Sequence, residues 1–331
     1  MSGFWDGRSV LVTGGNGFIG SHLVERLVQV GARVTTTASR EETRWRFLEA
    51  VRQQVEVLVG DLRDLAHARR AVREQDVVFH LAARVGGIAY NITHPGSVFR
   101  ENLEPFLSTM EAARLERIGR FIVTSSACVY PRLCTIPTPE SEGFQGWPEP
   151  TNEGYGWAKR MEEFVGASYA KEYGLEVRIA RLYNANGPRD NFHEASSHVI
   201  PALIRRVLSA ENPLTVWGDG TASRSFLYVA DAVRGLMAVA EHSPQVEAIN
   251  IGNEEETTVR QLAERIVSIC STSTRLVFDA SRPAGQPRRK CDTALARRLL
   301  QFETETQLAD GLAKTIAWYK LHHQPVEVKT V

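Results

Sequence analysis

A glycine-rich turn near the start of the chain constrains the fold more than any other feature of the sequence. An apolar run, Ser9–Thr13, leads directly into Gly15, Gly17 and Gly20, which have the spacing G-x-G-x-x-G, and residues 18–30 then show helical periodicity. Glycines at these positions permit a tight turn and let backbone N–H groups approach a pyrophosphate at the N-terminus of a helix. The segment therefore predicts a dinucleotide site formed by Gly14, Gly15, Asn16, Gly17, Phe18, Ile19 and Gly20.

Strands and helices alternate through the first half of the chain. We expect strands at residues 33–37, 55–59, 76–81, 120–124 and 176–181, and long helices at 97–116 and 153–173. This order predicts an α/β fold, a Rossmann-type, doubly wound parallel sheet covered by helices.

The alternation ends at residue 181, and the pattern beyond it predicts a smaller C-terminal substrate-binding lobe. Helices are expected at 198–208, 258–270 and 307–321, a strand at 276–279 and a basic loop at 283–292. The apolar segment 249–252 is expected to rejoin the main sheet as a strand. The predicted division is a dinucleotide-binding domain of residues 1–181 plus about 226–255, and a lobe of about 182–225 and 256–325.

Charge and composition exclude several classes of protein. Among the 331 residues, Lys and Arg number 39 and so do Asp and Glu, so no net charge attracts nucleic acid or an anionic membrane. The first residues lack the apolar core of a signal peptide, and no apolar run has the length of a membrane span. The four cysteines, at positions 128, 134, 270 and 291, have no zinc-like spacing. We expect a cytoplasmic protein without a metal and without nucleic-acid or membrane partners.

A tyrosine and a lysine four residues apart provide the first chemical signal. Tyr155 and Lys159 lie on one face of the helix expected at 153–173. A nearby ammonium stabilises a phenolate, so we expect the pKa of Tyr155 to fall below its usual value of about 10. Ser126, at the end of a preceding strand, can share a substrate oxygen with the phenol. The three residues predict proton transfer to or from an oxygen of the substrate.

The end of the second strand indicates which dinucleotide binds. NAD enzymes usually have an acidic residue there that accepts from the ribose 2′-hydroxyl, and none is present. The segment instead carries Ser39 and Arg40, with Arg44 a turn later, and a hydroxyl with guanidinium groups suits a 2′-phosphate. We therefore expect NADP(H) as the cofactor, with NAD as an open alternative. The small residues after the fourth strand let the chain pass close to cofactor and substrate.

These motifs together resemble the extended short-chain dehydrogenases of the NAD-dependent epimerase/dehydratase family, which act on nucleotide sugars. The resemblance rests on the glycine turn, Ser126, the Tyr155/Lys159 pair, the segment 184–188 and the motif Tyr228-x-x-x-Asp231, and it covers nearly the whole chain. It implies an adenine contact for Asp61 and a homodimer. The further cofactor contacts expected along this surface are Leu62, Leu81, Ala82 and Ala83.

Single residues separate three branches of this family. The 4,6-dehydratases carry an Asp and a Glu where this chain has Ala127 and Cys128, so water elimination would lack its proton donor. The 4-epimerases need no further acid or base, and Cys128 would then have no role. The segments 85–88, 126–131, 149–153, 190–193 and 197–202 look like those of GDP-L-fucose synthases, which are NADPH-dependent GDP-4-keto-6-deoxymannose 3,5-epimerase/4-reductases.

The chemistry of that branch gives roles to Cys128 and His198. A 4-keto group acidifies the hydrogens at C3 and C5, and inversion removes a proton from one face and returns one to the other. Cys128 can serve as the base and His198 as the acid, although the sequence leaves open which of the two is the base. Tyr155 would protonate the C4 oxygen during reduction, and Lys159 would bind the nicotinamide ribose.

The expected substrate is a nucleotide sugar, with GDP as the expected nucleotide. Guanidinium groups suit a diphosphate, and the residues expected to bind it or the sugar are Val85, Gly86, Ser126, Asn184, Arg206, Trp217, Arg224 and Arg289. Redox-neutral epimerases of the GDP-mannose 3,5-epimerase or UDP-sugar 4-epimerase type stay open as an alternative. A non-catalytic NADP-binding regulator is disfavoured because Ser126, Tyr155 and Lys159 are all present.

Overall fold

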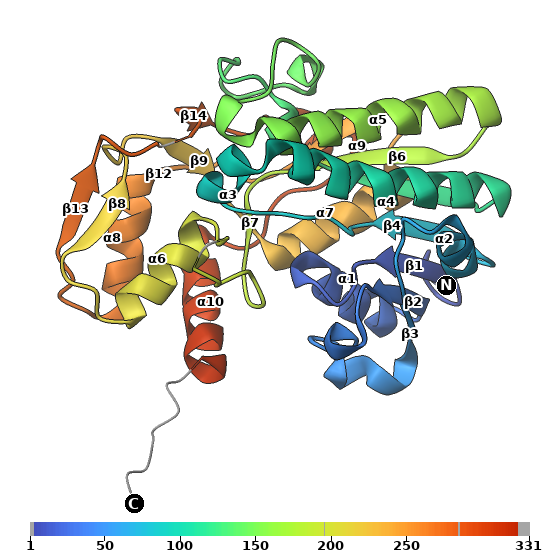
Figure 1. The fold of residues 1–331 in the computed structure, drawn as a ribbon, viewed down its shortest axis with the longest axis horizontal. Helices are drawn as coiled ribbons and strands as arrows, with labels where there is room; N and C mark the ends of the chain where they lie inside the picture. The colour runs from blue at the N-terminus through green and yellow to red at the C-terminus, as the bar shows by residue number, and fades with distance from the viewer. Residues whose placement is uncertain (1–2, 195, 284, 324–331) are drawn as a thin grey trace, which may run out of the picture.

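The computed structural model describes residues 3–194, 196–283 and 285–323. A large α/β body carries a smaller lobe at one end, and the C-terminal helix descends from that lobe (Figure 1). The expected end of the lobe at residue 325 lies outside the described residues.

Seven parallel strands form the main sheet, in the order β11-β6-β5-β4-β1-β2-β3. Their bounds are β1 Ser9–Thr13, β2 Arg33–Ala38, β3 Val55–Val59, β4 Val77–His80, β5 Arg120–Ser126, β6 Val177–Leu182 and β11 Ala248–Ile251. The predicted Rossmann-type sheet is confirmed, and β11 returns to it from the C-terminal half. The order reverses beside β1, so the carboxyl ends of β1 and β4 border the crevice where such folds bind ligands.

Helices cover both faces of this sheet, and successive strand residues feed two separate cores. In β1, Val10 and Val12 belong to the core under α1 Phe18–Gln29 and α7 Val229–His242, while Leu11 belongs to the core on the other face. That second core lies under α2 Leu65–Val72, α4 Pro95–Leu115 and α5 Glu153–Tyr173. Strands buried on both faces explain the near-continuous apolar runs in the sequence.

The lobe has a core of its own. It is formed by α6 Val199–Leu208, α8 Val259–Cys270 and α10 Leu308–His322, with β8 Leu214–Trp217 paired to β13 Leu276–Asp279. A three-stranded sheet joins β9 Ser223–Ser225, β12 Glu256–Thr258 and β14 Arg288–Arg289, and a two-stranded one joins β7 Ala185–Asn186 and β10 Leu227–Tyr228. The short helices α3, Ile88–Thr93, and α9, Ala294–Leu300, and five 3₁₀ turns complete the described elements.

Some elements differ from the sequence-based expectation. The basic segment 283–292 was expected to be a loop, but it contains β14, whose Arg288 and Arg289 pair with β9. The helix α9, Ala294–Leu300, falls in a stretch assigned to the lobe, yet it packs on β11 and α7 of the main sheet. The helices α3, α7 and α9 were not expected from the sequence.

None of the helices in the described part of the chain is long and apolar enough to cross a membrane. Among the same residues, no group of three His, Cys, Asp or Glu side chains could hold a metal ion.

Candidate active site

A cleft of about 1700 Å³ runs between the carboxyl ends of the sheet strands and the lobe. Of the residues that the sequence predicted for the site, only Gly15, Arg40 and Arg44 do not line it. The cleft thus brings together the glycine turn, the Tyr155/Lys159 pair and residues of the lobe. Its walls include Gly14, Asn16, Gly17, Phe18, Ile19, Gly20, Ser39, Asp61, Leu62, Leu81, Ala82, Ala83, Val85, Gly86, Ser126, Cys128, Tyr155, Lys159, Asn184, His198, Arg206, Trp217, Arg224 and Arg289.

The glycine turn fits a pyrophosphate. Gly14 has a φ of +67°, and a Cβ on Gly20 would lie 2.4 Å from the Gly14 carbonyl oxygen. Helix α1 begins after Gly17 with no side-chain cap and no acidic residue in its first turn. Its N-terminal N–H groups and the positive end of its dipole therefore face the cleft without competition. Gly15 has a packing role, because a Cβ there would lie 2.1 Å from the Thr36 Oγ1.

At the adenosine end of the cleft, the predicted residues Arg40 and Arg44 do not line the cavity, and Asp61 is paired with a neighbouring arginine. Arg40 is exposed, and the Arg44 guanidinium pairs with Glu41 at 3.1 Å and donates to the Val57 carbonyl at 3.3 Å. Asp61 is held by Arg63, whose Nη2 lies 2.6 Å from Asp61 Oδ2. The hydrogen bond from Arg63 lowers the pKa of Asp61. Ser39 is the one residue of the predicted ribose-phosphate set that lines the cleft.

The strand β5 and the helix α5 place Ser126, Tyr155 and Lys159 in one group. Ser126 ends β5, its Oγ accepts from the Cys128 N–H at 3.2 Å, and the hydroxyl also bonds to Tyr155. The Lys159 Nζ lies 5.6 Å from the centre of the Tyr155 ring. We expected a lowered pKa for Tyr155, but burial raises it well above 10, and the bond to Ser126 opposes this only in part.

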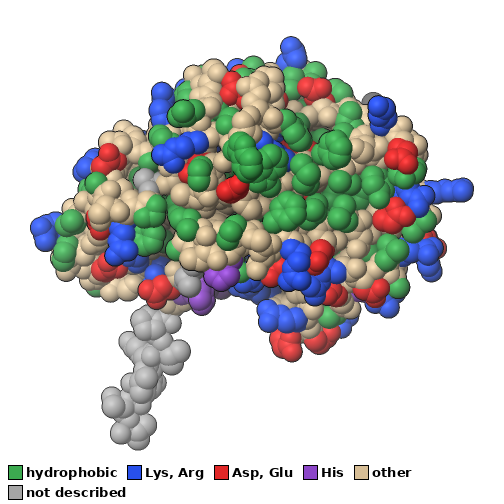
Figure 2. Space-filling model, turned by 45° about the horizontal axis from the view of Figure 1, so that its top comes forward, with side chains coloured by type: hydrophobic (Ala, Val, Ile, Leu, Met, Phe, Trp, Pro, Cys, Tyr) green, Lys and Arg blue, Asp and Glu red, His purple; other side chains and the backbone are tan. Residues whose placement is uncertain are grey.

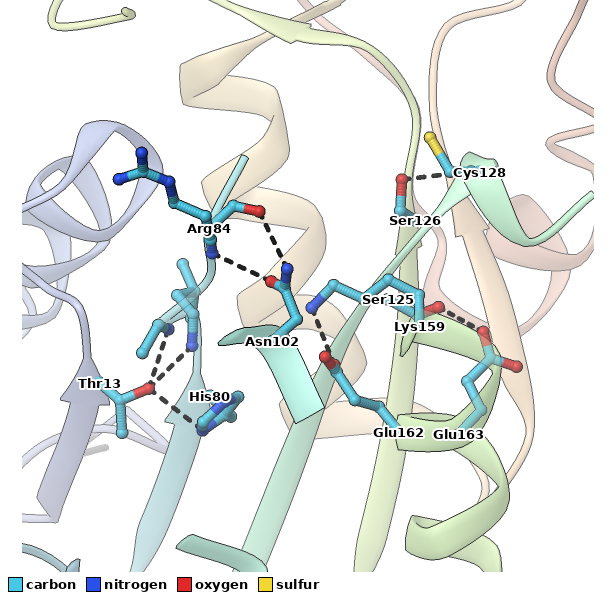
Figure 3. Close-up of polar contacts among 12 residues, drawn as sticks. Thr13, His80, Arg84, Asn102, Ser125, Ser126, Cys128, Lys159, Glu162 and Glu163 are labelled. Atoms are coloured by element: carbon cyan, nitrogen blue, oxygen red, sulfur yellow. Dashed lines mark hydrogen bonds and ion pairs between the residues drawn. The ribbon is translucent and has the colours of Figure 1, made fainter. Parts of the chain in front are cut away.

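Lys159 has a buried partner that the sequence analysis missed. Its ammonium donates to the Glu162 carboxylate one turn further along α5, as Figure 3 shows, and the N–O distance is 2.8 Å. Burial raises the pKa of Glu162 to about 7, although the attraction of Lys159 acts in the opposite direction. The i,i+3 spacing of the two residues is the signal that could have indicated this pair.

Cys128 lies among groups that donate toward its sulfur. The Asn152 Nδ2 donates to the Cys128 Sγ at 2.7 Å, and the Arg289 Nη1 lies 3.6 Å from the same atom. An amide N–H and a guanidinium N–H therefore both point toward this sulfur. The Asn152 Oδ1 accepts from Asn91 at 2.6 Å, and Asn91 also donates to the Gly86 carbonyl at 3.0 Å. Because the Asn152 Oδ1 accepts from Asn91, the NH₂ group of the Asn152 amide faces the sulfur.

His198 reaches the cleft from the lobe side. It is the N-cap residue of α6, and its ring bonds to the Gly86 carbonyl. The surrounding protein desolvates the imidazole and lowers its pKa, while the bond to Gly86 opposes this. His198 is thus biased toward the neutral form. The Gly86 carbonyl contacts both His198 and Asn91, so the supports of Cys128 and His198 meet there.

Arginines gather at the lobe end of the cleft. Burial and the nearby charge of Arg289 lower the pKa of Arg224 to about 9. Arg206 is oriented by Glu211, with the Nε 2.7 Å from the Oε2, and Arg289 by Gln286, with N–O distances of 2.6 and 2.9 Å.

The exposed Trp217 and a further cation, Arg282, line the same part of the cleft. Trp217 is 43% exposed, and the Arg282 guanidinium lies 5.7 Å from its ring centre. Asn184 is fixed by a 2.8 Å bond to the Ser225 carbonyl. An anionic, planar ligand could therefore find both cations and a stacking surface here.

Comparisons with known proteins agree with this geometry. Residues 10–252 match the model described as the NAD dependent epimerase/dehydratase family. The chain is 34% identical to the GDP-L-fucose synthase of Escherichia coli K12, over 94% of this chain and 96% of that protein. It is 30% identical to a dTDP-4-dehydro-6-deoxy-D-allose reductase of a Streptomyces species, over 96% and 98% of the two chains.

Solved structures give the same result. The crystal structure of UDP-glucose 4-epimerase from Thermotoga maritima matches with a TM-score of 0.85 and 28% identity, over 95% of this chain and 99% of the other. DesIV of Streptomyces venezuelae, a dTDP-glucose 4,6-dehydratase, matches with a TM-score of 0.82 and 28% identity, over 95% and 97%. The chain is therefore an enzyme of the NAD-dependent epimerase/dehydratase family, with the extended short-chain dehydrogenase fold.

Proposed function

We propose that the enzyme is an NADPH-dependent nucleotide-sugar 3,5-epimerase/4-reductase that acts on a GDP-4-keto-6-deoxy sugar. The observation that carries the proposal is that Cys128 and His198 line the same cleft as Ser126, Tyr155 and Lys159. A redox-neutral 4-epimerase needs only the last three. The Asn152 and Arg289 donors at the Cys128 sulfur support a chemical role for this residue, since a side chain that only fills space needs no such donors.

The epimerisation uses the two residues from opposite sides of the site. The ketone at C4 acidifies the hydrogens at C3 and C5, and the Cys128 thiolate removes each proton from one face. His198 returns a proton to the other face, and Ser126 holds the developing enolate oxygen by a hydrogen bond. The lowered pKa of His198 makes the reverse assignment, with His198 as base and Cys128 as acid, the competing version of the same scheme.

The reduction uses the group on α5. Bound NADPH supplies the hydride that reduces C4. Tyr155 gives its proton to the C4 oxygen, and its raised pKa keeps that proton in place until the oxygen becomes basic. Lys159 stabilises the phenolate that remains and binds the nicotinamide ribose.

The lobe would hold the nucleotide. Arg206, Arg224 and Arg289 suit the diphosphate, and Trp217 suits the base as a stacking surface. The GDP-L-fucose synthases among the relatives favour guanine. The similarity to dTDP-4-dehydro-6-deoxy-D-allose reductases makes a dTDP-linked 4-keto sugar the second candidate substrate.

The preference for NADP(H) over NAD rests on Ser39 and on the lack of an acid at the end of β2. Arg40 and Arg44 would have to turn toward the 2′-phosphate, since neither lines the cleft here. Ratios of the dissociation constants for NADPH and NADH test this directly, and Arg44→Ala should reduce the preference if Arg44 contacts the phosphate.

We also propose a homodimer through α4 and α5. Apolar side chains gather on the face of Figure 2, and the exposed ones on these helices include Leu107, Leu115 and Phe164. A contiguous apolar surface of this kind is typical of a protein interface. Sedimentation of Phe164→Asp should show a monomer where the wild type shows a dimer.

The direct test mixes the purified enzyme with GDP-4-keto-6-deoxymannose and NADPH and follows loss of the nicotinamide absorbance. Stoichiometric oxidation with a GDP-fucose product supports the proposal. Isomerisation without NADPH loss would identify a redox-neutral epimerase. If nothing changes, GDP-mannose and the dTDP-4-keto-6-deoxy sugars are the next substrates.

A further inference from the structure

Glu162 is a buried acid that the proposed reaction does not use. The side chains of Lys159 and Glu162 are 2% and 1% exposed, and the Lys159 Nζ lies 2.8 Å from the Glu162 Oε2. The Glu162 Oε1 is also buried, and it has no hydrogen-bond partner among the residues that the structure describes. A buried carboxylate with one oxygen unpaired is unfavourable, so a purely structural role accounts poorly for this residue.

The next residue, Glu163, shows how a structural acid is held on the same helix. Its two oxygens lie 2.8 and 2.7 Å from the guanidinium nitrogens of Arg181, and one of them also accepts from the Ser125 hydroxyl. Glu163 thereby joins α5 to β5 and β6. Figure 3 shows the two neighbours diverging, with Glu162 toward Lys159 and Glu163 toward Ser125.

The charge of Glu162 also reaches the reacting phenol. Burial, the Cys128 sulfur and the Glu162 carboxylate, in this order, raise the pKa of Tyr155. The Lys159 ammonium, 5.6 Å from the Tyr155 ring centre, has the opposite charge and contacts Glu162 directly. A carboxylate that binds this ammonium reduces its net effect on the phenol, whereas a neutral carboxyl leaves the effect intact.

We propose that Glu162 is a positioning residue for the reductive step, which holds the Lys159 ammonium on α5 and sets through its own charge how strongly that ammonium acts on the Tyr155 hydroxyl. The inference rests on the reduction proposed above. It requires no proton transfer between Glu162 and the substrate, since only the position and net charge of the pair matter.

The charged groups that act on Glu162 are Lys159 and Glu163 of its own helix. From the sheet, the buried His80 of β4 acts on Lys159, and burial lowers its pKa to about 3, so it is neutral above that pH. Burial raises the pKa of Glu162 to about 7 against the attraction of Lys159. The charge on the pair therefore changes close to neutral pH.

The variant Glu162→Gln separates charge from geometry, because its amide oxygen can still accept from Lys159. The measurement is kcat for NADPH oxidation with the 4-keto sugar as a function of pH. Removal of the negative charge should move the alkaline limb, which reports loss of the Tyr155 proton, to lower pH by about one unit. A merely structural role would lower kcat without moving this limb, and an unmoved limb would overturn the proposal. The control Glu163→Gln should lower stability and leave the limb in place.

A second readout is independent of turnover. In the NADP-bound enzyme, the infrared band of a protonated carboxyl that is present in the wild type and missing in Glu162→Gln should titrate near pH 7. Lys159→Met should shift this titration upward by about one pH unit or more. A band that titrates identically with and without the ammonium would refute the coupling. If the wild type oxidises no NADPH with any 4-keto sugar, the proposed function fails, while this titration still decides the Lys159–Glu162 pair.

Discussion

The two halves of the site to which we assign the reduction and the epimerisation are held in different ways. Tyr155 and Lys159 lie on one helix of the main domain, α5, which also carries the buried acids Glu162, paired with Lys159, and Glu163, paired with Arg181. Cys128 lies in the 3₁₀ turn that follows β5, and His198 comes from the lobe; the Asn152 amide, the Arg289 guanidinium and the Gly86 carbonyl contact them. The first half is complete within the Rossmann domain, whereas the second half exists only when the lobe is docked on it.

From this difference we expect that the proposed reduction at C4 and the proposed epimerisation at C3 and C5 can be separated by mutation. A change on α5 should affect the reduction and leave proton exchange at C3 and C5 intact, and a change around Cys128 should do the opposite. The variants below test that separation from the largest expected effect to the smallest.

Cys128→Ser should abolish incorporation of solvent deuterium at C3 and C5, with a loss of roughly 100-fold or more, because a hydroxyl is a far weaker base than a thiolate. NADPH binding should be unchanged, since the cofactor surface lies at the glycine turn. Deuterium analysis of the sugar by NMR and a fluorescence titration with NADPH measure the two. Full exchange in this variant would remove Cys128 from the mechanism.

Tyr155→Phe should have the converse effect. Loss of the hydroxyl removes the proton donor for the C4 oxygen, so NADPH oxidation should fall by roughly 100-fold or more. Deuterium should still enter at C3 and C5 in the absence of net reduction. If exchange and reduction fell together, the two halves would share this tyrosine and the proposed separation would be wrong.

Asn152→Leu should weaken the epimerising half moderately. It removes the 2.7 Å amide donor to the Cys128 sulfur, and one such hydrogen bond corresponds to about a 10-fold slower exchange. Asn152→Asp should be slower still, because it places a negative charge beside the thiolate. NADPH oxidation with an already epimerised 4-keto sugar serves as the control and should change little.

Glu162→Gln should change how the stability of the protein depends on pH. The folded-state pKa of Glu162, about 7, is raised above its unfolded value, so the carboxyl favours folding below that unfolded value. This contribution is lost as the pH rises from about 4 to 7, and the neutral glutamine does not lose it. The difference in unfolding free energy, variant minus wild type, should therefore increase by about 1–3 kcal/mol between pH 4 and pH 8. Urea titrations at several pH values would show this, and parallel pH curves for the two proteins would argue against a buried ionising Glu162.

The reductive half was largely predictable from the sequence because its signals are local. The glycine turn follows β1 at once, and Tyr155 and Lys159 are one turn apart on a helix. The fold class followed from the alternation of strands and helices for the same reason. Glu162 was equally local, but nothing in the sequence shows that it is buried.

The support of the epimerising half was not predictable in this way. Asn91 and Asn152 are far apart in the sequence, and only the packing of α3 against the 3₁₀ turn Pro150–Asn152 brings them together. The positions of Arg40 and Arg44 outside the cleft likewise depend on the path of the turn after β2. Cys128 and His198 were identified through resemblance to a family, since 70 residues separate them in the chain.

One reaction tests the central claim most directly. The wild-type enzyme, GDP-4-keto-6-deoxymannose and NADPH are combined in deuterated water, and NADPH loss and deuterium at C3 and C5 are measured together. The account predicts one NADPH oxidised per product, with deuterium at both carbons. NADPH oxidation without deuterium at either carbon would show a plain 4-ketoreductase and contradict the roles given to Cys128 and His198.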